Sequence, residues 1–279
     1  ILGSLKVFGM KKIISWVFFF LWGSTVYAAT DQAAIDFLNK LDGHYYCLAR
    51  EGLLDFQCEV KCSLLEDYKV KCLKAFPPGD KRTQAIVPIK MVLTCSTNGK
   101  LSFDVTNFDP NGDGILEENV GKILEVVKGA FNENIEPWRS SILEPPFGGD
   151  DFVKFDLQIK KNSDGFEVFS TGDQPVTEYV DKQWRIFEIQ AGSLTAIQDC
   201  KFVYTDSPQG MLLSEVDTRL PQKAIQEKVW MEYQTMDGLV MPKKMTVHVA
   251  ATGNGGDSPF DVVFEFQNYQ IDKSPEETK

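Results

Sequence analysis

The chain has 279 residues, 43% of them hydrophobic, which is enough for one large β domain or two small ones with a core. Its formal net charge is −11 at pH 7, and because the first 29 residues hold three lysines and no acid, the remainder carries −14. Such a chain repels phosphate backbones, and no basic patch with interleaved aromatic residues offsets the charge, which argues against a nucleic-acid partner.

The N-terminal stretch has the three parts of a secretory signal peptide. Met10 is followed by two lysines, residues 13–22 are apolar with one serine, and Val26-Tyr-Ala28 is a small-x-small cleavage pattern. The apolar run is shorter than the roughly 20 residues of a spanning helix, which favours a cleaved leader over a retained anchor. We therefore expect residues 1–28 to be upstream residues plus a leader that starts at Met10. Residues 29–279 are predicted to form one β domain exported to the periplasm.

A helix and then strands follow the leader. Thr30 or Asp31 can cap a helix that breaks at Asp42-Gly43. From residue 55 onward the period changes to two, which predicts a first strand with Cys58 and Cys62 on its apolar face. Further strands are predicted at residues 68–76, 86–96 and 101–106, and the last two are joined by Asn98-Gly99, a hairpin signal.

The six cysteines of an exported chain form disulfides or pack as small apolar groups. Cys58 and Cys62 lie roughly 13 Å apart along one strand, too far to bridge each other. A turn within residues 63–69 would place Cys62 opposite Cys72, which makes this pair the candidate disulfide. The spacing does not suit a zinc site, and the chain has only two histidines. The six are Cys47, Cys58, Cys62, Cys72, Cys95 and Cys200.

Residues 109–120 resemble the calcium loop of EF-hand and dockerin-type proteins through their first nine positions. Position twelve holds Val120 where the family has a bidentate acid, so any site would bind calcium weakly. The alternative is a turn that caps the following helix. The candidate ligands are Asp109, Asn111, Asp113, Ile115 (through its carbonyl) and Glu117.

One long amphipathic helix is predicted between residues 116 and 142. Since Pro137 interrupts a helical hydrogen-bond ladder, we expect one helix that ends near Glu133 and a second that starts at Pro137. The apolar stripe covers one side of the sheet, and a mobile lid is the alternative.

Short alternating segments from residue 152 onward predict an antiparallel meander, beginning with strand 152–161, the turn Asn162–Gly165 and strand 166–169. A longer excursion is expected over residues 217–227. The chain is thus predicted to be mainly β with helices (α+β). The remaining strands are expected at 178–189, 194–205, 211–216, 229–236, 244–250 and 260–271.

The histidines do not indicate catalysis. His248 alternates with apolar neighbours and is expected on the solvent face, and His44 adjoins two tyrosines. Neither has a serine or cysteine nearby in a nucleophile motif, so we expect no enzyme activity.

Residues 238–249, Gly-Leu-Val-Met-Pro-Lys-Lys followed by an alternating strand, and the aromatic strand 262–271 resemble the closing strands of the LolA-like periplasmic lipoprotein-carrier superfamily. The resemblance implies a large, incompletely closed antiparallel β-barrel covered by an N-terminal helix and a central amphipathic helix. Its concave face would hold an acyl chain. The sequence departs from the family in the first strand, and no particular arginine can be assigned as a cargo latch. Candidate lining residues are Phe131, Trp138, Phe155, Leu157, Val247, Phe264 and Phe266.

These observations predict a non-catalytic binding protein that holds a lipid or a lipoprotein acyl chain, with calcium as the only cofactor to consider. The alternative is an envelope sensor or interaction module that binds a protein partner. A calcium-stabilised structural protein is the third hypothesis.

Overall fold

The computed structural model of the chain describes residues 32–96, 100–108, 115–139, 143, 157–170, 176–191, 198–220, 225–251 and 259–274. The expected leader and the capping residues Thr30 and Asp31 lie outside these ranges, and so does the Asn98-Gly99 turn.

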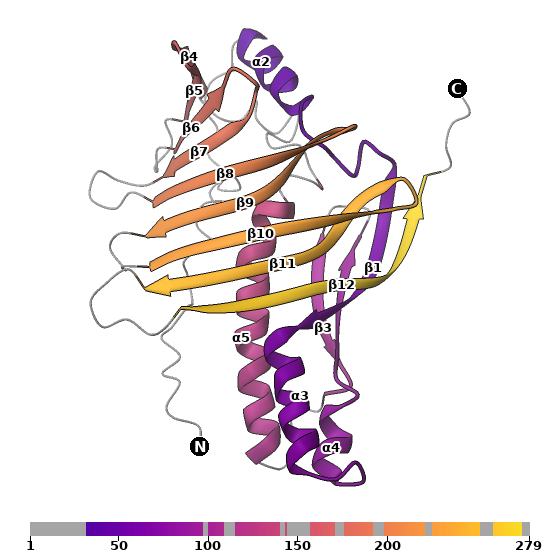
Figure 1. Ribbon diagram of the computed structural model, residues 1–279. Helices are drawn as coiled ribbons and strands as arrows, with labels where there is room; N and C mark the ends of the chain where they lie inside the picture. The colour runs from indigo at the N-terminus through magenta and orange to yellow at the C-terminus, as the bar shows by residue number, and fades with distance from the viewer. Residues whose placement is uncertain are drawn as a thin grey trace.

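The described residues form one twelve-stranded sheet with four helices (Figure 1). The helices are α2 (Gln32–Asp42), α3 (Ser63–Ala75), α4 (Lys81–Ile86) and α5 (Ile115–Trp138). The strands are β1 (Leu53–Cys62), β2 (Lys90–Cys95), β3 (Leu101–Thr106), β4 (Leu157–Lys161), β5 (Gly165–Ser170), β6 (Val176–Asp181), β7 (Ile186–Ala191), β8 (Gln198–Ser207), β9 (Gly210–Leu220), β10 (Ile225–Met236), β11 (Leu239–Ala251) and β12 (Phe260–Lys273).

The sheet order is β3-β2-β1-β12-β11-β10-β9-β8-β7-β6-β5-β4, and every neighbouring pair is antiparallel. The first strand therefore pairs with the last, while β3 and β4 are the two edges and the sheet does not close. This confirms the predicted mainly β fold with a large antiparallel sheet and helices.

Alternation along the strands separates an inner, buried face from an outer one. In β1 the predicted apolar positions Phe56, Cys58, Val60 and Cys62 are all buried. The turn at residues 162–165 is also confirmed, since the Asn162 side-chain oxygen accepts hydrogen bonds from the amides of Asp164 and Gly165.

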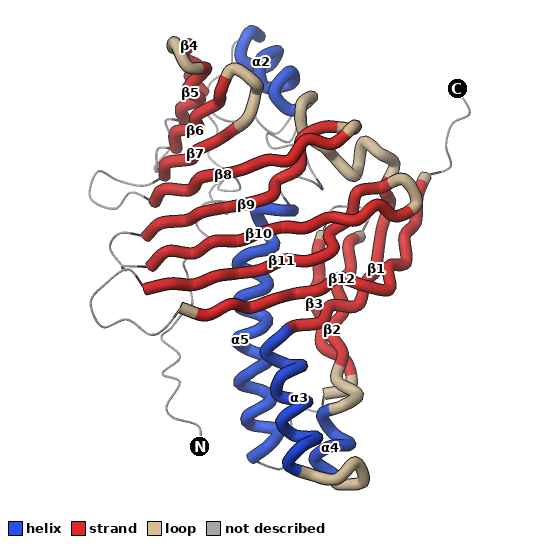
Figure 2. The backbone as a smooth tube through the Cα atoms, in the orientation of Figure 1, coloured by secondary structure: helices blue, strands red, loops and turns tan. Residues whose placement is uncertain are grey.

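Helix α5 crosses the inner face of the sheet (Figure 2). It is one 24-residue helix, so the predicted break near Glu133 is wrong. Pro137 lies one residue before its end, where the missing amide removes a single hydrogen bond of the last turn. The neighbouring Trp138 is fully buried and anchors that turn by packing.

The strand predicted at residues 68–76 is wrong, because α3 covers Ser63–Ala75. Leu65 and Cys72, two helical turns apart, are its buried residues, and the segment is rich in the straight-chain residues that favour helices. The predicted strand 86–96 begins later, at Lys90, after the short helix α4, whose N-cap Asp80 accepts from the Arg82 amide.

The predicted Cys62–Cys72 disulfide depended on a turn into that strand, so it is not supported once the segment is a helix. Ten residues of helix span roughly 15 Å, well beyond the reach of a disulfide. All six cysteines are buried thiols in the structure.

Two boundaries of the meander also differ from the prediction. Segment 178–189 splits into β6 and β7, because the Asp181 carboxylate accepts from the amides of Gln183 and Arg185 and stabilises a turn. The excursion predicted over residues 217–227 is wrong for its described residues, since residues 217–220 of β9 pair with residues 225–228 of β10. Strand β4 begins at Leu157, and the predicted strand residues before it lie outside the described ranges.

Two tyrosines after α2 attach the N-terminal segment to strands far along the chain. The amide of Ile186 donates to the Tyr45 hydroxyl at 2.7 Å, and the amide of Val240 donates to the Tyr46 hydroxyl at 2.8 Å, both in buried surroundings. The main chain of Tyr46 also donates to the Met211 carbonyl at 3.0 Å.

Replacing Tyr45 by phenylalanine leaves the buried Ile186 amide without its acceptor and is expected to lower the free energy of unfolding by about 1–3 kcal/mol. Chemical denaturation measures this difference. Tyr179→Phe is the matched control, since that hydroxyl is part-buried and has a hydrogen bond of 3.4 Å. An equal loss in both variants would contradict the assigned role of Tyr45.

Candidate functional site

The inner face of the sheet has an apolar floor and one polar row near its rim. Directly opposed residues of neighbouring strands point to the same face. A buried floor row runs through β8 to β12: Phe202, Val216, Val229, Val247 and Val262. A second row on that face runs from β5 to β11 and is called the polar row because it contains Glu178, Thr218 and Glu227. Its members are Val168, Glu178, Ile189, Cys200, Thr218, Glu227 and Val249.

Helix α5 covers this floor. The Phe131 ring is stacked on Phe103 of β3 at 4.1 Å between centroids and meets Phe264 and Phe266 of β12 at 5.3 and 6.2 Å. Since β3 and β12 are separated by β2 and β1 in the sheet, these contacts require the sheet to curve around the helix.

The structure brings Phe131, Phe264 and Phe266 together and buries Trp138 and Val247, so these five predicted lining residues belong to the packed core. Phe155 lies outside the described residues. Leu157 opens β4, and its side chain lies outside what is described.

Three buried oxygen atoms near the polar row have no hydrogen-bond partner in the described part of the chain: Oε2 of Glu178, Oε1 of Glu227 and Oδ1 of Asn134 on α5. Buried polar groups are nearly always paired in native proteins, so each unpaired one calls for an explanation. The Asn134 amide nitrogen donates to the Ala130 carbonyl at 2.9 Å, and the Asn134 side chain also lies next to the Glu227 carboxyl group.

Burial keeps the Glu178 carboxyl group mostly neutral at pH 7 and the Glu227 carboxyl group about half neutral. It raises the pKa of Glu178 to about 8, and the negative charge of Asp42 adds to the shift. Burial also raises the pKa of Glu227 to about 7, where an interaction with Asn134 lowers it and the charge of Glu133 raises it. A neutral carboxyl group can donate as well as accept a hydrogen bond.

The two glutamates do not form an acid pair. Four inter-strand steps separate β6 from β10, which places their backbones roughly 19 Å apart. Sequence reasoning missed both residues, although the signal was present. Glu178 lies between Val176 and Val180, and Glu227 between Ile225 and Val229, so each occupies an apolar position of an alternating strand.

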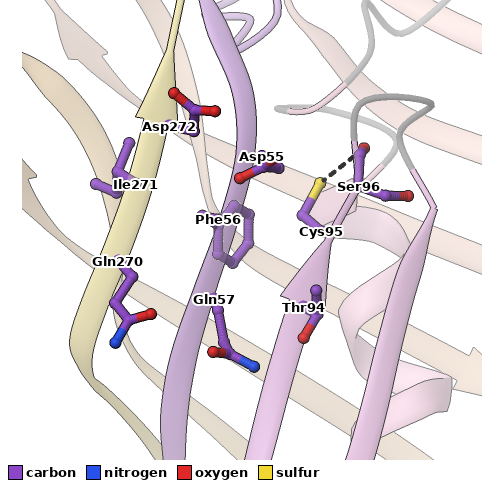
Figure 3. A pocket seen from close by; sticks show the side chains of 9 residues that line it. All are labelled: Asp55, Phe56, Gln57, Thr94, Cys95, Ser96, Gln270, Ile271 and Asp272. Carbon is purple, nitrogen blue, oxygen red and sulfur yellow. Dashed lines mark hydrogen bonds between the residues drawn. The ribbon is translucent and has the colours of Figure 1, made fainter.

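A hollow of about 450 Å³ lies where β1, β2 and β12 run side by side (Figure 3). The β1–β12 pairing has two register irregularities in this region. Asp55 and Asp272 face each other across it without a basic residue in the lining. Two acids at an open surface do not define a ligand, so the hollow has no assigned function. Its lining is Asp55, Phe56, Gln57, Thr94, Cys95, Ser96, Gln270, Ile271 and Asp272.

The described contacts of the two histidines are a carboxylate for His248 and an aromatic ring for His44. His248 is partly exposed on the outer face, as predicted, and its Nδ1 lies 2.6 Å from the Asp261 carboxylate. Its cross-strand neighbours are Lys228 and Asp261. The His44 ring stacks on Trp184 at 5.5 Å between centroids.

The calcium hypothesis stays a prediction. Asp109, Asn111 and Asp113 lie outside the described residues, and Ile115 and Glu117 lie in the first turn of α5. Val120, at position twelve, is buried. Within the ranges that the structure describes, no three acidic, cysteine or histidine residues gather in a way that could hold a metal ion.

Comparison with protein-family models, with curated proteins and with solved structures found no match. Among the described residues, no helix is both long and apolar enough to cross a membrane. The function of the chain must therefore be argued from the geometry of the sheet and its covering helix.

Proposed function

We propose that this chain is an exported, non-catalytic binding protein that holds the acyl chain of a lipid or lipoprotein on the inner face of its curved sheet. The sheet acts as an incompletely closed barrel, and α5 is the cover of the ligand. The observation that carries the proposal is the pairing of an apolar floor with unpaired, buried polar atoms of Glu178, Glu227 and Asn134 beside it. Ligand pockets typically combine a mostly apolar lining with a few placed polar groups.

The chemistry of the two parts suits an amphiphile. Valine and phenylalanine side chains of β8 to β12 offer dispersion contacts to an alkyl chain. In their neutral form, the carboxyl groups of Glu178 and Glu227 can donate hydrogen bonds to an ester, amide or carboxylate head. Because α5 packs on the floor, binding requires the helix to move away from part of it.

The first test is native mass spectrometry of the purified protein, prepared without detergent, before and after incubation with palmitate. We expect an acyl-chain adduct at one molecule per chain, identified after organic extraction. A clean mass with no uptake of palmitate or of a lysophospholipid would overturn the proposal.

A pair of variants on β11 locates the ligand. Val249 lies on the inner face beside Glu227, and the next residue, Ala250, points to the outer face opposite Gln226. Tryptophan at position 249 would fill the rim of the floor, so Val249→Trp is expected to lower palmitate occupancy at least fivefold. Ala250→Trp adds the same side chain outside and is expected to bind like the unchanged protein. Equal binding by both variants would place the ligand elsewhere.

The full burial of Phe131 and Trp138 favours a second candidate function. If α5 fills the floor permanently, no acyl chain binds there. The protein would then be an interaction module that binds a protein partner at its outer surface. That reading predicts the clean mass described above.

A further inference from the structure

The hairpin tip, defined as residues 63–89 with α3, α4 and their connecting loop, projects beyond the sheet beside one end of α5 (Figures 1 and 2). It is attached by few elements, since α3 contacts α4, α5, β1 and β12. The tip therefore presents most of its outer surface away from the rest of the protein.

This tip exposes apolar side chains that the fold does not use. Seven large hydrophobic side chains are exposed among the described residues, and Val70, Leu73 and Val87 of the tip are three of them. Val70 and Leu73 lie one turn apart on an exposed side of α3, away from its buried Leu65 and Cys72. A β-branched valine is a poor choice for an exposed helix position on propensity grounds, which indicates another role.

The charge of the tip is opposite to that of the chain. Residues 63–89 contain five Lys or Arg and three Asp or Glu, a net charge of +2, whereas the whole chain carries −11. Lys69 pairs with Glu66 at 2.9 Å and Arg82 with Asp80 at 2.7 Å. No acidic side chain in the described residues forms an ion pair with the other three lysines of the two helices, Lys71, Lys74 and Lys81.

We propose that the hairpin tip docks this protein on the surface of a bilayer that contains anionic phospholipid. Val70, Leu73 and Val87 enter the headgroup region, while Lys71, Lys74 and Lys81 bind lipid phosphate. Helices that lie at a membrane surface combine these two features, apolar side chains on one face and lysines beside them. Long lysine side chains can keep their ammonium groups at the phosphates while their stems lie on apolar surface.

The distribution of charge favours this occupant and this orientation. The rest of the chain carries −13 and is repelled by an anionic surface, so the positive tip is the end that approaches it. Pro77 and Pro78, in the loop between α3 and α4, are exposed and have no backbone N–H. This lowers the free-energy cost of moving the loop into the membrane interface, where an unpaired N–H would lose its hydrogen bonds to water. The proposal goes beyond acyl-chain binding and does not depend on it, because the tip residues are distinct from the floor and the polar row.

The test is vesicle flotation of the protein as recovered from the producing cell, so that all variants carry the same N-terminus. Vesicles of phosphatidylcholine with 30% phosphatidylglycerol are compared with pure phosphatidylcholine at low and high salt. We expect binding to the anionic vesicles at least tenfold tighter than to the neutral ones, with most of the difference lost at high salt.

Two sets of variants separate the electrostatic and apolar contributions. The tip variant Lys71→Gln, Lys74→Gln, Lys81→Gln is expected to lose about fivefold in affinity for each lysine. Val70→Gln with Leu73→Gln is expected to weaken binding at least fivefold while its salt dependence remains. The control, Lys161→Gln, Lys182→Gln, Lys201→Gln, changes net charge equally at exposed positions outside the tip and should bind within twofold of the unchanged protein.

Three outcomes would overturn the proposal: no flotation of the unchanged protein with anionic vesicles, equal losses in the tip and control variants, or unaltered binding after the Val70 and Leu73 changes. Because all eight positions are exposed, the variants are expected to fold, and thermal unfolding of each variant checks this. None of these outcomes coincides with the palmitate result, so the two proposals fail or stand separately.

Discussion

Replacing Phe131 by alanine is expected to lower the free energy of unfolding by about 3–5 kcal/mol, the usual cost of removing a fully buried aromatic side chain. The ring is 1% exposed and lies between α5 and the two parts of the sheet formed by β3 and β12. Its loss would separate the helix from both. For a domain of this size the melting temperature should fall by roughly 8–15 °C.

Phe187→Ala is the matched control, because the Phe187 side chain on β7 is 41% exposed. Its removal should cost less than about 1 kcal/mol, as for most surface substitutions. Denaturant titrations of both variants give the comparison. A loss at position 131 no larger than at position 187 would mean that α5 is not held by its aromatic contacts.

The Phe131→Ala variant also tests how a ligand would bind under α5. If an acyl chain lies between α5 and the floor, part of its binding energy is spent on moving the helix. Phe131→Ala weakens the closed arrangement, so palmitate should bind more tightly to this variant despite its lower stability. A fall in affinity that parallels the fall in stability would instead make Phe131 a direct contact of the ligand.

The fold was predictable from the sequence wherever one strand face is apolar and the other polar. Strands β1 and β3 and the last two strands have this pattern over six residues or more, and their positions are confirmed. Segment 68–76 misled because Tyr68, Val70, Cys72 and Phe76 also alternate. The spacing of Leu65 and Cys72, which the helix buries, became informative only once tertiary contacts were known.

Only the apolar part of the candidate site could be predicted from the sequence. Phe131, Phe264 and Phe266 were predicted from the resemblance and from amphipathicity, and the structure brings them together. The polar row was missed because Glu178 was placed at the very start of a strand and Glu227 in an excursion. Only the register of β6 to β10 shows that both carboxyl groups point to the inner face.

Those two carboxyl groups are expected to make the protein less stable as the pH rises. In the unfolded chain they titrate near the ordinary value of 4.5, whereas burial raises the folded-state pKa of Glu178 to about 8 and of Glu227 to about 7. Between pH 4.5 and 8 the folded state therefore binds more protons than the unfolded state, and the free energy of unfolding falls with increasing pH. Their favourable contribution is complete below pH 4.5 and is lost by about pH 8.

The double variant Glu178→Gln, Glu227→Gln removes both titrations while it keeps the size and hydrogen-bonding capacity of the side chains. At pH 8 it should exceed the unchanged protein in stability by on the order of 3 kcal/mol, since one pKa unit corresponds to 1.36 kcal/mol and relaxation of the site reduces the full shift. In melting temperature the gain is roughly 6–12 °C. At pH 5 the two proteins should melt within a few degrees of each other.

Melting curves collected from pH 5 to 8.5 measure this difference, and comparing the two proteins at each pH cancels every other titrating group. The control is Glu232→Gln with Glu265→Gln, two exposed glutamates on β10 and β12. It should follow the unchanged protein across the whole range. If the double variant also follows it, the inner carboxyl groups are ionised and hydrated in the folded state, and the polar row would be an open aqueous rim unsuited to the head of an amphiphile.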